Sequence, residues 1–210
     1  MRSTVAVLPA SPLTEALAES RRSSRVVSVD LIRGAAMVLM ALDHVRYFIT
    51  DRDFPPENLA HTTLPLFLTR WVTHFCAPAF FLLAGTGARL SLLGGRSPGE
   101  VASFLWRRGL LLVVLELTLV GFAWQFVPGY SFAGVIWCLG VSMILLAPAV
   151  RWLPTRAIGI AALVIIGLHD LTDPFRGGWL WSLLHRSGTV RIGGLELFVL
   201  FPLIPWVAVM

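Results

Sequence analysis

The chain has 210 residues, of which 56% are hydrophobic and 14% are charged. A chain this apolar has too few polar side chains to cover a water-exposed surface, which excludes a soluble globular domain and indicates a lipid bilayer. All seventeen basic residues are arginines, for a formal charge of +5, and they form short clusters between apolar runs, which excludes lysine Schiff-base chemistry and does not indicate a nucleic-acid partner.

Residues 1–28 are polar, rich in Ser and Arg, and lack the continuous apolar core of a secretory signal. They are predicted to form a disordered cytoplasmic tail, followed by a transmembrane domain over residues 29–210. Apolar runs close to the spanning length of about 20 residues occupy 31–50, 72–93, 108–127, 131–150, 156–171 and 194–210. The predicted fold class is therefore all-α, a polytopic transmembrane bundle of about six helices. The last run ends without a polar flank, so the chain is expected to be the N-terminal part of a larger bundle.

The arginines predict that the N-terminus lies in the cytoplasm, because Lys and Arg favour cytoplasmic loops. They cluster before the first run, after the second and after the fourth, whereas the 51–71 loop mixes arginines with acidic residues. The 172–193 loop, placed outside by this orientation, carries three arginines and is the exception. All five histidines then fall toward the extracytoplasmic side: His44, His61, His74, His169 and His185. Histidine is the side chain best suited to proton transfer near neutral pH, so catalysis is expected on this side.

The first apolar run carries ionisable residues along one helical face. Arg33 and His44 are eleven residues apart, which brings them within about 20° of each other and separates them by about 16 Å along the axis. Asp30 falls on nearly the same face. Ionisable residues inside a membrane usually face a cavity or a partner, which favours a functional role for Asp43, His44 and Arg46. The alternative is that Asp30 and Arg33 reach the interface and His44 only packs.

The second run opens with polar residues. Thr73 and His74 are expected at the height where His44 lies, and Pro78 frees a backbone carbonyl one turn away, so a polar pocket between the first two helices is predicted. In the third run, Glu116 is expected to face the bundle interior, with an Arg or His of the first two helices as its partner in a structural ion pair or a relay.

Packing roles are predicted for small and sulfur-containing residues. The Gly- and Ala-rich segment 84–88 lets another helix approach closely, which makes a homodimer through this face reasonable. Cys76 and Cys138 lie inside apolar stretches and are predicted to be buried thiols without a disulfide framework. No motif supports a metal site.

Five segments together carry a family resemblance: SVDLIRG at 28–34, MALDHVR at 40–46, RWVTHFCAP at 70–78, LAG at 83–85 and FPLIPW at 201–206. They resemble the bacterial relatives of heparan-alpha-glucosaminide N-acetyltransferase, over roughly residues 25–210. The Arg-Gly and His spacing of the first run is also similar to the membrane acyltransferase type 3 group, whose catalytic candidate in the first helix falls on His44.

The resemblance implies a membrane-bound N- or O-acetyltransferase that takes cytosolic acetyl-CoA and delivers the acyl group to an amine or hydroxyl of a sugar on the other side. A histidine of the first lumenal loop is implicated in the lysosomal enzyme, and in chain order it falls on His61. The phosphates of acetyl-CoA are assigned to the arginines of the inner side, because a guanidinium binds phosphate through bidentate, charge-assisted hydrogen bonds. The nearest such cluster is Arg33, Arg107 and Arg108.

At the outer end, His44 is expected to act as the general base toward the acceptor, with Asp43 or an acid on a neighbouring helix orienting its ring. His74 is expected to stabilise the thioester oxyanion or to act as a second base. A two-step route through an acyl-histidine intermediate stays open.

Two other classes of function compete with acyl transfer. One is a proton-coupled transporter or flippase-like carrier, although the chain shows no inverted internal repeat. The other is a non-catalytic membrane scaffold in which the histidines only pack. The expected partners are the lipid bilayer and a sugar or glycan acceptor, and the expected location is the cytoplasmic (inner) membrane, with several spans.

Overall fold

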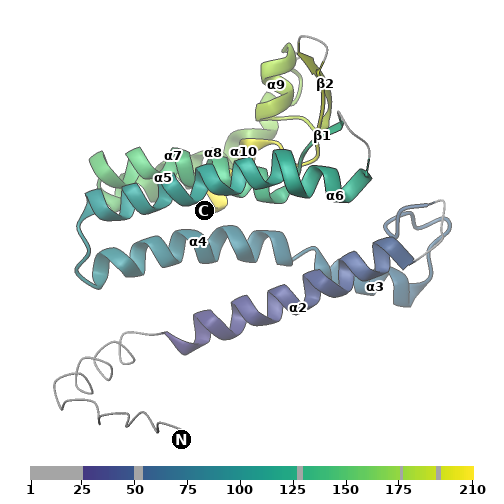
Figure 1. Cartoon of the computed structure of the whole chain (residues 1–210), viewed down its shortest axis with the longest axis horizontal. Helices are drawn as coiled ribbons and strands as arrows, with labels where there is room; N and C mark the ends of the chain where they lie inside the picture. Colours follow the sequence, from purple (N-terminus) through teal and green to yellow (C-terminus); the bar gives the residue numbers. More distant parts are fainter. Residues whose placement is uncertain (1–25, 50–53, 127–129, 176, 193–194) are drawn as a thin grey trace, which may run out of the picture.

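The computed structural model describes residues 26–49, 54–126, 130–175, 177–192 and 195–210 (Figure 1). The predicted tail at 1–28 therefore lies outside the described residues except for its last three positions. The first described helix, α2, already begins at Val27.

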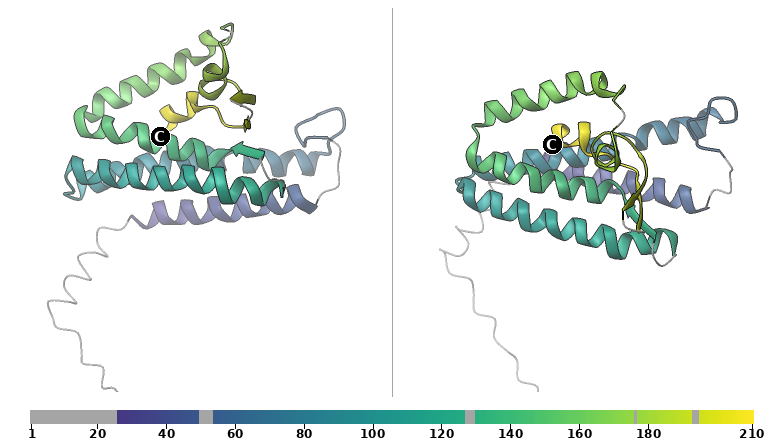
Figure 2. Two further views of the ribbon diagram at one scale, coloured as in Figure 1. Left: turned by 45° about the horizontal axis from the view of Figure 1, so that its top comes forward. Right: turned by 90° about the horizontal axis from the view of Figure 1, so that it is seen from above.

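Helices dominate the structure, which confirms the all-α fold class. The helical segments are α2 (Val27–Ile49), α3 (Leu64–Thr73), α4 (Cys76–Leu93), α5 (Pro98–Leu115), the π-helix η1 (Glu116–Val120), α6 (Gly121–Gln125), α7 (Val135–Trp152), α8 (Thr155–Leu168), the 3-10 turn η2 (His169–Thr172), α9 (Trp179–Leu184) and α10 (Leu203–Val209). Helix α4 contacts α2, α5 and α7, and α10 packs against α4, α7 and α8 (Figure 1). The two rotated views of Figure 2 show α5 and α6 continuing one another as one long helix beside α7.

Three stretches of the described residues are long and apolar enough to cross a bilayer: Leu64–Leu93, Val135–Trp152 and Thr155–Thr172. The first joins α3 to α4 through a short break at His74 and Phe75. Helix α2 is also 23 residues long, but it carries two acidic and two basic residues. Large apolar side chains along α8 are exposed, Leu163 by 71%, as expected of a helix face in contact with lipid.

The predicted helix at 194–210 is wrong. Its described part divides into strand β3 (Leu195–Val199) and the short helix α10 (Leu203–Val209). Pro202 and Pro205 lack the amide N–H that a continuous helix needs. A short apolar run does not by itself distinguish a buried strand from a helix, so hydropathy alone gave no warning of the strand.

The sequence analysis also missed a small sheet. Its strands are β1 (Tyr130–Ala133), β2 (Gly188–Ile192) and β3, in the order β1-β3-β2. Strand β1 is parallel to β3 and pairs Phe132 with Phe198, whereas β2 is antiparallel to β3. In this sheet, residues 130–133 pair with residues 196–199. The first residues of the 131–150 run are therefore in a strand, and the fourth predicted helix begins only at Val135.

Glycines set the closest helix contacts in the core. A Cβ at Gly109 would lie 2.5 Å from the carbonyl oxygen of Gly140, and one at Gly85 would lie 1.7 Å from the backbone oxygen of Met210. Gly85 therefore packs against the end of α10 within the same chain. Cys76 and Cys138 are 3% and 0% exposed, which confirms their prediction as buried thiols.

Candidate functional site

A cavity of about 800 Å³ lies among α2, α3, α4, η1, α6 and the small sheet, and we call it the α2–η1 cavity. Its walls include the second half of α2, residues 54–57, the α3–α4 junction, η1 and residues 198–206. Asp43, His44 and His74 all line it. The predicted polar pocket between the first two helices is thereby confirmed.

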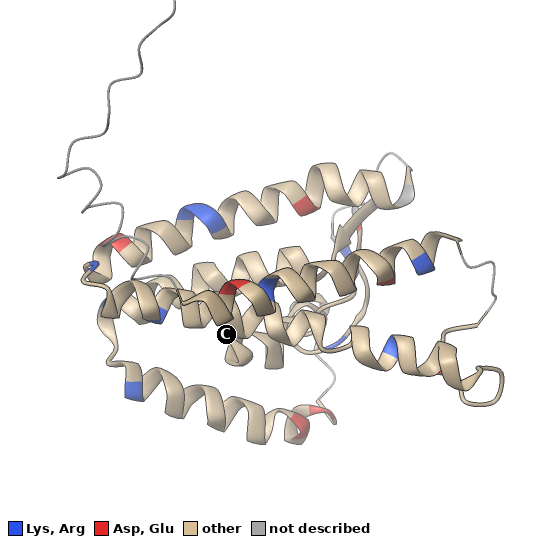
Figure 3. Ribbon diagram, turned by 90° about the horizontal axis from the view of Figure 1, so that it is seen from below, with Lys and Arg blue, Asp and Glu red and all other residues tan. Residues whose placement is uncertain are grey.

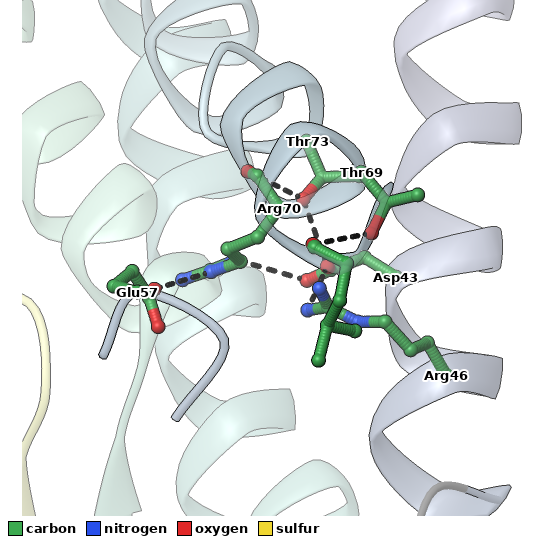
Figure 4. Close-up of polar contacts among 7 residues, drawn as sticks. Asp43, Arg46, Glu57, Thr69, Arg70 and Thr73 are labelled. Atoms are coloured by element: carbon green, nitrogen blue, oxygen red, sulfur yellow. Dashed lines mark hydrogen bonds and ion pairs between the residues drawn. The ribbon is translucent and has the colours of Figure 1, made fainter. Parts of the chain in front are cut away.

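Asp43 is the centre of a polar network on one wall of this cavity (Figure 4). Its Oδ1 accepts hydrogen bonds from Thr73 Oγ1 at 2.8 Å and from Arg46 Nη2, and its Oδ2 accepts one from Arg70 Nη1 at 3.1 Å. Arg70 also donates through Nε to Glu57 Oε1 at 2.7 Å. The network joins α2, α3 and the segment before α3, and thereby fixes the wall that carries His44.

The pKa of Glu57, which lies in the loop before α3, is held below its ordinary value of 4.5. Partial burial acts to raise this pKa, but the hydrogen bond from Arg70, a backbone hydrogen bond and the electrostatic effects of the nearby Arg70 and His74 side chains outweigh it. Glu57 is therefore a carboxylate at neutral pH.

The geometry does not give Asp43 the ring-orienting role expected of it. Successive residues of a helix point about 100° apart, so Asp43 and His44 do not face each other. Both carboxylate oxygens of Asp43 are taken by Arg46, Arg70 and Thr73, and no hydrogen bond joins Asp43 to His44 in the described structure. Asp43 holds the two arginines instead.

His44 lies against a cluster of aromatic rings. Its ring makes a T-shaped contact with Trp124, with 5.2 Å between centroids and 79° between planes. Trp124 also stacks on Tyr47 at 5.4 Å and on Phe132 at 6.1 Å. Within the described residues, the ring nitrogens of His44 and His74 have no hydrogen-bond partner, so both imidazoles have nitrogen atoms available to a molecule in the cavity.

Glu116 also lines the cavity and is 1% exposed, which confirms the prediction that it faces the interior. Its partner was predicted wrongly: Oε1 accepts a hydrogen bond from the backbone N–H of Gly134 at 2.9 Å, and from no Arg or His. Gly134 allows this approach because a Cβ there would lie 2.4 Å from Oε1. Glu116 is the first residue of the π-helix η1, and π-helical turns often occur at functional sites.

The other predicted site residues lie outside the α2–η1 cavity. His61 is exposed, with its ring centroid 5.8 Å from that of Phe54. Arg33 forms an exposed ion pair with Asp30 at 3.6 Å on α2.

Arg107 and Arg108 line a separate groove of about 750 Å³ that runs along α5 as far as Leu111 and that we call the α5 groove. Its other lining residues are Ser97, Gly99, Glu100, Ser103 and Phe104. Figure 3 shows that charged positions are few along the helices, most of whose length carries other residue types. The structure thus brings Arg107 and Arg108 together but does not place Arg33 in that groove.

The two remaining histidines form a second polar cluster. His185 Nε2 lies 2.7 Å from Asp173 Oδ1 and 3.3 Å from Thr172 Oγ1, and the ring of His169 is 6.3 Å away. This cluster joins η2 to α9 and does not line the α2–η1 cavity.

The sequence was also compared with the profiles of known protein families. The profile described as heparan-alpha-glucosaminide N-acetyltransferase, catalytic, matches residues 25–210. The chain belongs to this family. Membership indicates a membrane acetyltransferase type of function, and it confirms the family resemblance. The chain matched no curated protein and no solved structure.

Three residues that line the α2–η1 cavity were not predicted as site residues from the sequence: Glu57, Arg70 and Trp124. Arg70 was detectable, because Arg70, Thr73 and His74 are spaced so that they share one helical face. Glu57 and Trp124 reach the cavity only through tertiary contacts, and no local pattern marks them.

Proposed function

We propose that this chain is an integral membrane acyltransferase that moves an acetyl group from cytosolic acetyl-CoA to an amine or hydroxyl of a sugar on the extracytoplasmic side. The observation that carries the proposal is that one cavity is lined by two imidazoles that have no hydrogen-bond partner among the described residues. Family membership supports the acetyltransferase reaction type.

The α5 groove is the proposed site for the phosphates of acetyl-CoA. Arg107 and Arg108 are adjacent and exposed in it, and guanidinium groups bind phosphate oxygens in a bidentate manner. Arg33 is a further candidate on α2, where binding phosphate requires it to give up its ion pair with Asp30.

In the proposed reaction, His44 takes the proton from the attacking amine or hydroxyl as the C–N or C–O bond forms. His74 stabilises the negative charge that develops on the thioester oxygen. The C–S bond then breaks, and the proton held by His44 passes to the departing thiolate. The Asp43 network holds α2 and α3 together at the cavity wall. His61 is proposed as a further candidate, because its ring lies 5.8 Å from that of Phe54, which lines the cavity. A two-step route through an acyl-histidine is the alternative to direct transfer.

The protein is proposed to span the cytoplasmic (inner) membrane several times, with its N-terminus in the cytoplasm. Its proposed partners are the lipid bilayer and a sugar acceptor. A homodimer through the small-residue segment 84–88 is also proposed; Gly85 packs on Met210 within the chain, whereas nothing lies within 4 Å of a Cβ at Gly87, so the proposed contact uses the side of α4 that carries Gly87.

The test uses the full chain in liposomes with labelled acetyl-CoA and glucosamine, and measures labelled product. His44→Ala is expected to lower the rate by about 100-fold or more, because it removes the general base. His74→Ala is expected to lower it by about 100-fold through the lost oxyanion contact. The matched control is His169→Ala, since His169 lies outside the cavity and should leave the rate within about twofold of wild type. An undiminished rate in His44→Ala would contradict the proposal.

A further inference from the structure

Glu116 is the most deeply buried charged side chain of the α2–η1 cavity, at 1% exposure. Oε1 is bound by the Gly134 amide, whereas Oε2 is buried and has no hydrogen-bond partner in the described structure. Burying a carboxylate without full compensation is costly, so an unmatched oxygen in a cavity wall indicates a ligand that completes its bonding.

The charged residues that line the cavity indicate the charge of that ligand. Arg46 and Arg70 are matched by the carboxylates of Asp43 and Glu57. Glu116 has no such counter-charge among the described residues, so the cavity carries one net negative charge when the imidazoles are neutral and Glu116 is ionised. A cationic group is the electrostatic complement of this site.

Glu116 and His44 belong to one continuous wall. The ring of His44 contacts Trp124, and Trp124 stacks on Phe132. A Cβ at Gly134 would lie 2.4 Å from both the Phe132 ring and Glu116 Oε1, so the ring and the carboxylate are neighbours. A small molecule resting on these aromatic rings therefore has the imidazole at one end and the carboxylate at the other.

We infer that Glu116 binds the ammonium group of an amino-sugar acceptor and takes its first proton; this inference rests on the proposed acyl transfer. An amine that arrives as R–NH3+ must lose two protons to become an amide. Glu116 accepts the first, which leaves the neutral amine that attacks the thioester carbon. His44 accepts the second as the C–N bond forms and passes it to the thiolate when the C–S bond breaks. Glu116 returns its proton to water, so the net products are amide, thiol and one proton.

The charged or titratable groups that share the cavity with Glu116 are Asp43, His44, Arg46, Tyr47, Glu57, Arg70, His74 and Cys76. The cavity-lining residues of η1, α6, β1 and α7, which pack around Glu116, add no further charge. Glu116→Gln keeps the volume and the oxygen that accepts from Gly134 but cannot accept a proton.

The experiment measures kcat/KM for glucosamine against pH in the full chain. In Glu116→Gln it is expected to fall about tenfold or more below the pKa of the glucosamine amine, and to recover above it, where the acceptor arrives as the free base. His44→Ala should stay inactive throughout. A loss equal at every pH, or no loss, overturns the role of Glu116, whereas an active His44→Ala or an inactive wild type overturns the acyl-transfer proposal instead.

A second measurement needs no variant and covers the case in which Glu116→Gln does not fold. The wild-type chain is expected to bind glucosamine about tenfold or more tightly than glucose, because only glucosamine offers an ammonium group to Oε2. Equal affinities for the two sugars would overturn the inference.

Discussion

Asp43 is the residue on which the cavity wall depends most. Its side chain is 18% exposed and holds Arg46 and Arg70, which are 18% and 30% exposed. Asp43→Ala leaves two partly buried guanidinium groups without their carboxylate, and we expect it to lower the free energy of unfolding by about 1–3 kcal/mol. Thermal unfolding in detergent measures this change. The control is Glu196→Ala, because the Arg191–Glu196 pair is 79% and 50% exposed and should contribute little; equal effects of both would contradict the prediction.

Glu57 gives the network a dependence on pH. Its pKa is lowered in the folded chain, so its pair with Arg70 stabilises the fold above 4.5 and loses that effect as the pH falls through the folded value. The melting temperature of wild type is therefore expected to exceed that of Glu57→Gln at neutral pH, and the two should converge in acid. A difference that persists unchanged in acid would show that the carboxylate charge is not the cause.

The sequence predicted the central residues of the site and missed their partners. His44 and His74 were found because ionisable residues in apolar runs are costly and therefore informative. Glu57 lies thirteen residues before Arg70 in the sequence, and neither helical nor strand periodicity predicts a pair at that spacing. The partner of Glu116 was missed because its donor is a backbone amide. Every residue except proline has such an amide, so the residue type does not identify the donor.

Helices α5 and α7 cross where Gly109 faces Gly140. A Cβ at Gly140 would lie 2.7 Å from the carbonyl oxygen of Gly109, which is backbone and does not move aside easily. Gly140→Ala is therefore expected to lower stability by about 1–3 kcal/mol, measured as a lower melting temperature in detergent. Gly159→Ala on α8 is the control, since nothing lies within 4 Å and alanine favours a helix; a stable Gly140→Ala would argue against this crossing.

Hydropathy predicts the long apolar helices but not the small sheet. Length and apolarity identified α2, α4, α7 and α8, because those helices are apolar over most of their length. They failed at 194–210, where the backbone hydrogen bonds of β3 go to β1 and β2, strands that begin some 65 residues and seven residues earlier in the chain. Strand pairing of this kind depends on distant segments, which the local pattern does not contain.

The connections between the helices lie at two opposite ends of the molecule (Figures 1 and 2). The α4–α5 and α7–α8 connections lie together at one end, where Arg89 of α4 donates a hydrogen bond to Thr155 of α8 (Figures 1 and 2). Residues 54–63, which precede α3, lie at the other end (Figure 1), and the first four of them line the α2–η1 cavity. A transferase that draws its donor from one side and its acceptor from the other needs this separation.

Cysteine labelling tests which end faces the cytoplasm. Ala60 is exposed before α3, and Leu153 is 53% exposed between α7 and α8. Because Cys76 and Cys138 are buried, the parent chain should give a low background with a membrane-impermeant maleimide. Ala60→Cys is expected to react in intact cells, and Leu153→Cys only after permeabilisation, since the arginine-rich connections belong inside. The reverse pattern would place the cavity on the cytoplasmic side, where donor and acceptor would meet without any transfer across the membrane.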